Sequence, residues 1–414
     1  MNSSKICLYA VLIIVSTRIL TYIGFPPLIN FINFPIVMII FFFHTNKLKN
    51  VDSTLLYLII LLSFLIIASG LINFTGIINI ILQILLYVSF FLFFIVLVAT
   101  EWSKENIDFF KKGLATIFII NILFSYFQIF IKGFVGDLVH GVALNLGTAA
   151  HLNGSICLIS FLFFVFYFNP KNKMLSYSLA LLNLPIIFYS DAKQVLLVIA
   201  LAWITTVIIN IKFNKRFLKE LFWFFLGIII SYYILTSDLI PIRDYDNLMV
   251  GFEHKFSVLD MIFEKNTLVQ FFLGIGPGQT ISRLATESYL YYDTLRNLGF
   301  VHSDFTRMLV TTDYFNYAIS GSSFFSMKFS FAGILGDLGI LGLITYILIL
   351  VRINYKYSLS KIQSFVMVSF FYYGLTFTWL EEPIFMILYF SFFGFIWQST
   401  NYKNKEKLKI IEDN

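Results

Sequence analysis

The sequence has little charge and almost no cysteine. Asp, Glu, Lys and Arg make up only 13% of its 414 residues, about half the share usual in soluble domains. Hydrophobic residues make up 59%, phenylalanine alone contributes 51 residues, and the mean hydropathy is +0.85. This composition excludes an ordinary soluble enzyme, a nucleic-acid-binding domain and a disordered chain. The two cysteines, Cys7 and Cys157, lie in apolar runs, so we expect no disulfide and no cysteine metal site.

Continuous apolar runs occupy most of the chain. A helix that crosses a membrane needs about 20 mostly apolar residues, and an open sheet cannot cross lipid. The runs do not alternate in polarity, which excludes a transmembrane barrel. We therefore predict an all-α polytopic membrane protein with about twelve transmembrane helices. The predicted spans lie near 5–23, 27–43, 54–72, 77–99, 113–131, 149–168, 174–190, 194–211, 221–239, 331–351, 363–380 and 384–397.

The distribution of charge predicts the orientation of these spans. With twelve spans both termini lie on one side, and the segments on that side hold 19 of the 29 Lys and Arg residues. The positive-inside rule therefore places both termini in the cytoplasm. The predicted organisation is nine transmembrane helices in 1–236, a large outer loop at 237–330, three further helices in 331–397, and a basic cytoplasmic tail at 398–414.

The outer loop at 237–330 is much longer than the other connections. Loops of this length in compact proteins are usually functional or disordered, and its apolar stripe around 256–263 favours order. We therefore expect the working parts of the protein to face outward and the loop to carry short helices. Two acid–histidine pairs in it, Glu253 with His254 and His302 with Asp304, could do general acid–base chemistry. Each could equally be an ordinary surface pair.

The most distinctive motif lies inside this loop. Residues 272–283 read FLGIGPGQTISR, so Gly274, Gly276 and Gly278 alternate and Arg283 follows. Alternating glycines let a backbone approach a ligand closely, and their N–H groups can hold phosphate. The Arg283 guanidinium is a planar fork suited to phosphate oxygens. The alternative is a plain turn after an interfacial helix. A dinucleotide site is excluded because no strand precedes the glycines.

Two further segments carry charge at or inside the predicted spans. The short connection 190–194, SDAKQ, holds Asp191 and Lys193, and is either a solvated turn with a snorkelling lysine or a cation that meets a phosphate. Asp337 lies about two turns inside an apolar helix. Intramembrane acids cost about 2.5–3.5 kcal/mol on insertion scales, so a paired or functional role is expected. The glycines that recur every three residues around it are typical of close packing.

The remaining charged positions have simpler interpretations. Arg18, near the outer end of the first span, is expected to snorkel to the interface. Glu381 and Glu382 form the short outer turn before the last span, and we favour a turn over a catalytic pair. Asp244 and Asp246 match a DxD metal motif, but two acids at that spacing are weak evidence.

Taken with their order along the chain, these motifs resemble the O-antigen ligase/polymerase superfamily, and most closely its Wzy-like O-antigen and capsular polysaccharide polymerases. The resemblance depends on GIGPG at 274–278, DAKQ at 191–194 and FAGILGDLGILG at 331–342. It implies a C-type membrane glycosyltransferase of the bacterial inner membrane. Such an enzyme would polymerise undecaprenyl-diphosphate-linked oligosaccharide repeat units, with that glycan as donor and acceptor, and with no metal or organic cofactor. A separate chain-length regulator is an expected partner.

The resemblance also suggests roles for particular residues. Lys193, Arg283 and Lys328, with the backbone at Gly276 and Gly278, would bind the donor diphosphate. The acceptor hydroxyl would be activated by an acid or histidine of the outer loop, and the candidates are His302, Asp304 and Glu253. The ligases carry a histidine where this chain has Lys328, which argues against a ligase. A lipid-linked glycan flippase is the other alternative, although few charges lie inside the spans.

Overall fold

The computed structural model describes most of the chain as helices joined by short connections. The described residues are 3–22, 25, 32–49, 51–143, 149–168, 172–190, 192–210, 222, 225–226, 229, 245–290, 292–320 and 326–412. Within these ranges there is no strand, so the predicted all-α class is confirmed.

Six helices in the described ranges are long and apolar enough to cross a membrane. They are α1 (Ser3–Tyr22), α3 (Ser53–Ile72), α4 (Ile77–Ala99), α5 (Lys104–Tyr126, continued by a π-helical turn at Phe127–Ile131), α16 (Ser330–Tyr357) and α18 (Pro383–Glu412). Shorter apolar helices are α2 (Asn33–His44), α6 (Ala149–Phe166), α7 (Lys173–Leu181) with α8 (Asn183–Tyr189), and α9 (Lys193–Asn210). The chain is a multi-pass membrane protein.

The number of spans stays a prediction. The spans predicted at 54–72 and 77–99 coincide with α3 and α4 to within one residue. The span predicted at 363–380 corresponds to α17 (Lys361–Thr376), which is shorter than the six long helices. The span predicted at 221–239 lies almost entirely outside the described residues.

Polar caps fix where several helices begin. The side chain of Asp52 accepts a hydrogen bond from the N–H of Thr54 at the start of α3. Ser103, Asn172 and Ser360 cap α5, α7 and α17 in the same way. Each cap satisfies an N–H group that has no partner inside its helix. Because a polar capping residue precedes each of these helices in the sequence, the residue at which each helix begins is determined by its immediate neighbours.

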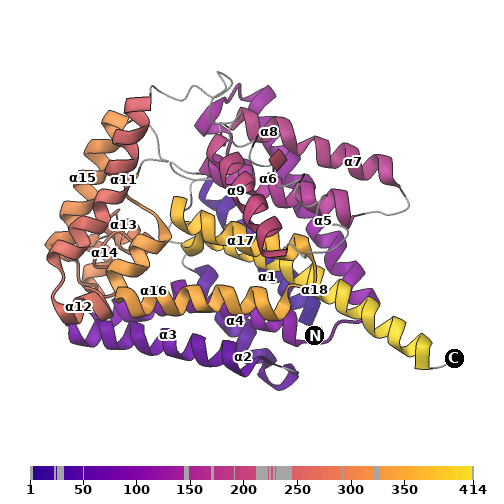
Figure 1. Ribbon diagram of the computed structural model, residues 1–414, viewed down its shortest axis with the longest axis horizontal. Helices are drawn as coiled ribbons and strands as arrows, with labels where there is room; N and C mark the ends of the chain where they lie inside the picture. The colour runs from indigo at the N-terminus through magenta and orange to yellow at the C-terminus, as the bar shows by residue number, and fades with distance from the viewer. Residues whose placement is uncertain are drawn as a thin grey trace.

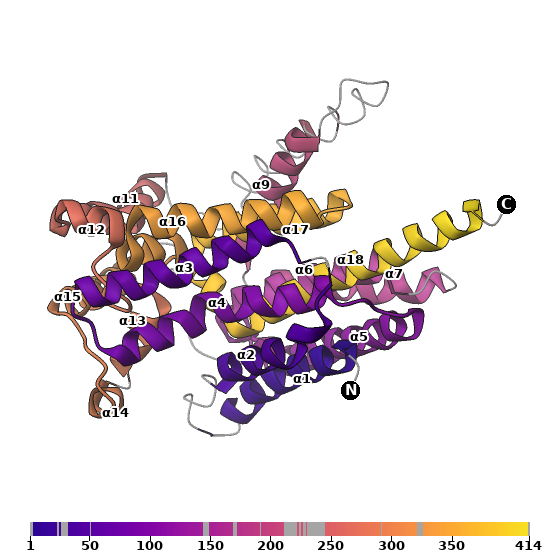
Figure 2. The same ribbon diagram turned by 90° about the horizontal axis from the view of Figure 1, so that it is seen from below.

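The bundle has two different ends, and the long helices run between them (Figures 1 and 2). The loop end is formed by five helices: α11 (Tyr245–Lys265), α12 (Leu268–Leu273), α13 (Arg283–Leu290), α14 (Tyr292–Asn297) and α15 (Asp304–Ser320). The lysine end is formed by the connections 45–52, 100–103 and 358–360 with the last part of α18, 398–412. Both chain termini lie at the lysine end.

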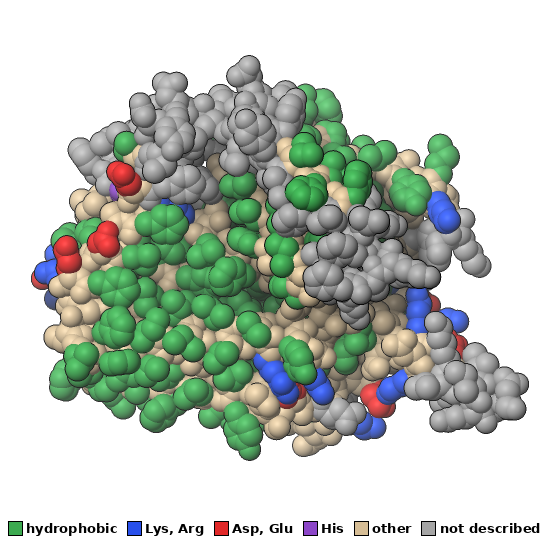
Figure 3. All heavy atoms as spheres, in the orientation of Figure 1, with side chains coloured by type: hydrophobic (Ala, Val, Ile, Leu, Met, Phe, Trp, Pro, Cys, Tyr) green, Lys and Arg blue, Asp and Glu red, His purple; other side chains and the backbone are tan. Residues whose placement is uncertain are grey.

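Helices distant in sequence pack together between these ends. Helix α16 lies against α3, and α18 packs against α4, α1 and α5. Aromatic side chains fill this core: the ring of Phe94 contacts those of Tyr357, Phe390 and Phe393 at 5.1–5.5 Å between centroids. The outer surface is also apolar, since Tyr57 and Phe64 of α3 are 70% and 63% exposed. Figure 3 shows hydrophobic side chains covering the face between the two ends, as a lipid-facing surface requires.

Candidate functional site

The alternating glycines form a tight loop that lies against α16. A capping box between Thr267 and Gln270 begins α12, and Gly274 ends it with φ of 79°. Gly276 and Gly278 also have positive φ, at 120° and 68°. Three left-handed positions in five residues are accessible only because glycine has no Cβ. The chain therefore reverses sharply at this point and returns toward α13.

The Asp337 side chain holds this loop in place. Its carboxylate accepts hydrogen bonds from the N–H of Gly278 at 2.9 Å, and from the N–H and hydroxyl of Thr280 at 3.1 and 2.6 Å. Asp337 is completely buried. An acid inside an apolar helix is thus satisfied by loop donors, which is the paired role expected for it.

Helix α16 is broken at Gly339, and the break exposes backbone carbonyls to the loop. Gly339 has φ of 66° and ψ of −172°, which interrupts the helical hydrogen bonding. The carbonyl of Gly336 accepts from the N–H of Ile275 at 2.8 Å, and that of Asp337 accepts from the hydroxyl of Ser69 at 2.8 Å. Broken helices are tolerated at membrane depth only where other protein groups satisfy the freed backbone. Here the glycine loop and α3 supply those groups.

The backbone N–H groups of Gly276 and Gly278, which were predicted to bind phosphate, both have acceptors inside the protein. The N–H of Gly276 donates to the carbonyl of Asp337 at 3.2 Å, and the N–H of Gly278 donates to its carboxylate. Both donors are already used inside the protein, so these glycines position the loop. The glycine face of α16 does serve close packing, since a Cβ at Gly336 would lie 2.6 Å from the hydroxyl of Thr280. The glycine face of α16 therefore packs against the glycine loop, whereas the sequence predicted that it packs against another helix.

Four charged side chains meet beside the loop, from three distant segments. Arg18 of α1 and Arg283 at the start of α13 both form ion pairs with Glu382, one with each carboxylate oxygen. The carboxylate of Glu381 accepts a hydrogen bond from the backbone N–H of Arg283 at 2.6 Å. We call these residues, Arg18, Arg283, Glu381 and Glu382, the arginine–glutamate cluster. It joins the first span, the outer loop and the connection before the last helix.

The cluster is buried and its charges balance. The side chains of Arg18 and Glu382 are each 5% exposed, and that of Arg283 is 16% exposed. Two guanidinium groups and two carboxylates sum to zero at neutral pH. Burying these charges without partners would cost several kcal/mol each, so the pairing is a condition of their burial. Arginine forks in a protected site are also the preferred partners of phosphate oxygens.

The expectations for Arg18 and for the two glutamates need correction. Arg18 does not snorkel to the interface, because it points inward to a carboxylate 364 residues away in the sequence. Glu381 does lie in a tight turn, the 3₁₀ turn Trp379–Glu381, but both glutamate side chains are buried. A signal was present in the sequence: one arginine inside a span needs an acid. Glu381 and Glu382, beside the last apolar run, were candidates for the acid that pairs with this arginine.

His302 is held close to this cluster through α13. Its Nε2 lies 3.3 Å from the hydroxyl of Ser288 and 3.2 Å from the carbonyl of Ala285, which are five and two residues along α13 from Arg283. Partial burial lowers the pKa of His302 below its usual value. The imidazole is therefore mostly neutral at physiological pH and has a nitrogen that can accept a proton.

The other predicted bases lie at the surface of the loop end. Asp304 is 97% exposed and lies 3.7 Å from Arg307 one turn along α15, so it does not pair with His302. Glu253 is exposed on α11. Of the three predicted bases, only His302 hydrogen-bonds to α13, the helix that begins with Arg283.

Lys328 belongs to a second charged group where the outer loop enters α16. Its Nζ lies 3.2 Å from the buried carboxylate of Asp313 on α15. That carboxylate also accepts from the hydroxyl of Ser326 at 2.9 Å and from the N–H of Met327 at 2.7 Å. Lys328 is 35% exposed on its side chain. It therefore remains partly accessible, while Asp313 fixes the entry to α16.

A buried lysine joins this second group to the end of α17. Lys255 of α11 donates from Nζ to the carbonyls of Thr376 at 2.9 Å and Ser326 at 3.2 Å. Burial lowers the pKa of Lys255 to about 7, and the nearby Asp313 opposes that shift. The outer loop is thus tied to the membrane helices by a lysine whose charge changes near neutral pH.

Some predicted positions fall outside the described part of the structure. Asp191, Asp244 and the side chain of Lys193 are among them, although α9 begins at Lys193. Cys7 and Cys157 are both buried free thiols. In the described ranges, His, Cys, Asp and Glu do not come together in any group of three that could hold a metal ion.

The chain was compared with family models, with curated proteins and with solved structures, and none matches it.

Proposed function

We propose that this chain is a membrane glycosyltransferase that polymerises undecaprenyl-diphosphate-linked oligosaccharide repeat units into O-antigen or capsular polysaccharide. The reaction would take place at the outer face of the bacterial inner membrane, with both termini in the cytoplasm. The observation that carries the proposal is the arginine–glutamate cluster, in which Arg18 and Arg283 converge on one buried carboxylate. The cluster lies beside the glycine loop, where the outer loop meets an apolar bundle. An arginine pair at the membrane surface suits a lipid-linked diphosphate, because guanidinium groups bind phosphate oxygens through two parallel hydrogen bonds.

In this proposal the donor diphosphate binds Arg18 and Arg283 in the position that the Glu382 carboxylate occupies in the structure. A diphosphate offers more oxygens and more negative charge than one carboxylate, so it can compete for Arg18 and Arg283. Arg283 is the more exposed of the two guanidinium groups. We therefore assign Arg283 the first contact with the donor. Displacement of Glu382 would leave a carboxylate beside the reacting sugar.

The proposed step moves one glycan chain and one proton. The acceptor hydroxyl oxygen bonds to the anomeric carbon of the donor, and the bond from that carbon to the diphosphate breaks. The electron pair of that bond leaves with undecaprenyl diphosphate, whose charge the two arginines stabilise. The hydroxyl proton passes to a base. Glu382, Glu381 and His302 are the candidates that lie near Arg283 in the structure.

Lys328 has a secondary role, which is to attract the anionic donor. Its ammonium group is partly exposed, so it can add to the attraction of an anionic donor while Asp313 holds it. The same position carries histidine in the ligases that the sequence resembles. The substitution favours a polymerase over a ligase.

A transporter of lipid-linked glycans is the second candidate. The break in α16 at Gly339 favours it, because transporters often bind substrates at discontinuous helices. In this chain the freed carbonyls of the break are satisfied by Ile275, Gly276 and Ser69. The break therefore builds the glycine loop, which is why we rank transport second.

A surface-glycan gel from cells without this gene tests the proposal. The deletion strain is complemented with the wild type, Arg283→Ala, Arg283→Lys or Arg307→Ala, at equal protein level. Arg307 is the matched control, because it is an exposed arginine on α15 at the same end. We expect the deletion strain and Arg283→Ala to show a single-repeat band. Arg307→Ala should restore the ladder. Losing one charge-stabilising group typically slows turnover about 100-fold, and Arg283→Lys should give shortened chains.

The same gel separates the alternatives. Full-length ladders that remain on the lipid carrier in the deletion strain would establish a ligase. Loss of all repeat units from the outer face would establish a transporter. A normal ladder from Arg283→Ala would remove the arginine–glutamate cluster from the reaction.

A further inference from the structure

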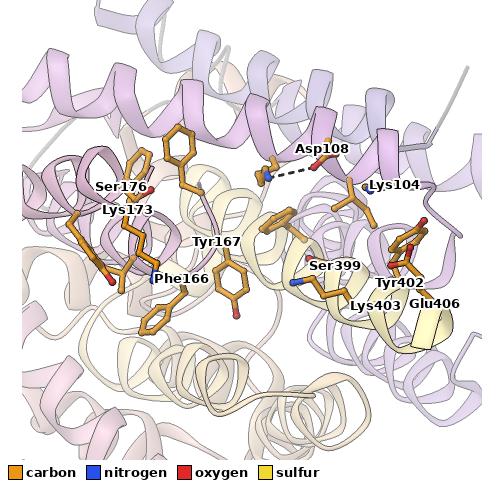
Figure 4. Close-up of a pocket in the computed structure, with 17 residues that line it drawn as sticks. Lys104, Asp108, Phe166, Tyr167, Lys173, Ser176, Ser399, Tyr402, Lys403 and Glu406 are labelled. Atoms are coloured by element: carbon orange, nitrogen blue, oxygen red, sulfur yellow. Dashed lines mark ion pairs between the residues drawn. The ribbon is translucent and has the colours of Figure 1, made fainter. Parts of the chain in front are cut away.

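A hollow at the lysine end is unrelated to the arginine–glutamate cluster. Its volume is about 510 Å³, within the range of small-molecule sites. The walls come from the first turns of α5 and α7, the last turn of α6 and the far part of α18 (Figure 4). We call this hollow the α5–α18 pocket. It lies at the opposite end of the bundle from the glycine loop.

Lysines predominate among the charged side chains of the α5–α18 pocket. Four of them line it, Lys104, Lys111, Lys173 and Lys403, with two acids, Asp108 and Glu406. Asp108 lies 3.5 Å from Lys111 on the same helix. Figure 4 shows the amino groups of Lys173 and Lys403 pointing toward Tyr167 from α7 and α18. The pocket therefore has a net charge of +2 and holds a cationic surface inside a concave site.

A second hollow at the same end is also lined by lysines, but most of these lysines have acidic partners. It is larger, about 780 Å³, and is lined by Lys49, Lys356 and Lys405. Two of those lysines are paired with Glu101, at 3.5 Å for Lys49 and 3.2 Å for Lys405. In the α5–α18 pocket, no ion pair within the described residues engages Lys104, Lys173 or Lys403. The excess positive charge is thus concentrated in the smaller pocket.

The rim of the α5–α18 pocket is apolar and faces outward. Phe166 and Tyr177 line it and are 56% and 49% exposed. Met174, next to Lys173, is 82% exposed. These side chains would lie in lipid if the bundle spans a bilayer, with the lysines at the level of the headgroups. A ligand that enters this pocket therefore meets cations at one end and hydrocarbon at the other.

We propose that the α5–α18 pocket binds the phosphate headgroup of an anionic phospholipid, with the acyl chains on the apolar rim. Basic pockets between membrane helices recognise such headgroups through phosphate oxygens. Lys173 and Lys403, which point toward Tyr167 from two walls, supply the contacts to phosphate, and Lys104 at the other side of the hollow adds to its positive charge. Soluble phosphate has the same oxygens but cannot use the apolar rim, so the lipid is the favoured source.

The test uses the full-length protein, purified in detergent and stripped of lipid. Native mass spectrometry measures binding of phosphatidylglycerol and, separately, phosphatidylcholine. The pocket variant is Lys104→Gln, Lys173→Gln and Lys403→Gln together. The matched control is Lys49→Gln, Lys356→Gln and Lys405→Gln, which removes the same charge from the second hollow at the same end. A second pocket variant with arginine at the three positions keeps the charge.

We expect the pocket variant to bind phosphatidylglycerol at least about tenfold more weakly, since it loses the lysines that attract the anionic headgroup. The control and the arginine variant should bind like the wild type, and phosphatidylcholine should bind weakly to all four proteins. Equal loss in the pocket variant and the control would overturn the proposal. So would displacement of the lipid by millimolar inorganic phosphate, which would identify a soluble anion as the ligand. Circular dichroism confirms that each variant is folded.

Discussion

The loop end and the lysine end carry charge in opposite ways. At the loop end Arg18 and Glu382 are each 5% exposed and directly paired. At the lysine end Lys405 and Glu101 are both 55% exposed and lie 3.2 Å apart. Water solvates the second pair, so its charges are stable without each other. The first pair is shielded from water, so its charges depend on partners inside the protein. Charge at the loop end is therefore fixed in place, and charge at the lysine end is free to rearrange.

This difference matches the two roles proposed for the ends. A site that stabilises a leaving diphosphate benefits from groups already oriented before the reaction. A headgroup site tolerates mobile lysines, because it needs charge near a phosphate more than a fixed geometry. Substitutions that change the charge or the backbone at each end test this difference.

The largest effect is expected from Glu382→Gln at the loop end. The change leaves two buried guanidinium groups without their carboxylate, and breaking a buried pair costs about 3–5 kcal/mol. The thermal unfolding temperature of the purified protein should fall sharply. Glu406→Gln, on the exposed far part of the same helix, is the control and should leave that temperature unchanged. If both variants unfold like the wild type, the arginine–glutamate cluster does not stabilise the bundle.

A smaller effect is expected from Gly274→Ala in the glycine loop. The positive φ of 79° costs a side chain about 1–2 kcal/mol, and the new Cβ would overlap the backbone carbonyl of Asp337. Gly133→Ala is the control, because Gly133 has φ of 64° and nothing within 4 Å of the Cβ position. Gly274→Ala should therefore be less stable than Gly133→Ala by about 1–3 kcal/mol, the usual cost of overpacking. Equal unfolding free energies would show that the loop can move away from α16.

The smallest effect is expected from Lys405→Gln at the lysine end. Exposed ion pairs contribute about 0.2–1 kcal/mol, and salt screens them. The unfolding temperature should change little at low salt and not at all at high salt. A loss as large as that of Glu382→Gln, persisting in high salt, would remove the contrast between the two ends.

Several local features follow from sequence alone because their causes are local. The bounds of α3 and α4 were predicted to within one residue, since unbroken apolar runs are flanked by polar caps and turns. Asp337 was expected to have a paired or functional role because an acid in an apolar helix is costly. The pairing itself, with Gly278 and Thr280, needed the structure.

The arginine–glutamate cluster could not be predicted in the same way. Arg18 and Glu382 lie 364 residues apart, and no periodicity or spacing connects them. A snorkelling arginine and a polar turn were each reasonable when considered separately. The acceptor of the N–H groups of Gly276 and Gly278, which is Asp337, could not be predicted from the sequence either.

A helical membrane protein with a long loop and a basic end can be recognised from the amino-acid sequence without its structure. Those properties depend on hydropathy and on the sign of nearby charges, which are local and additive. Tertiary structure alone decided which charges meet, which backbone donors are used and which lysines share a hollow. Burial makes those choices energetically important, because a charge removed from water must find its partner wherever the fold places one.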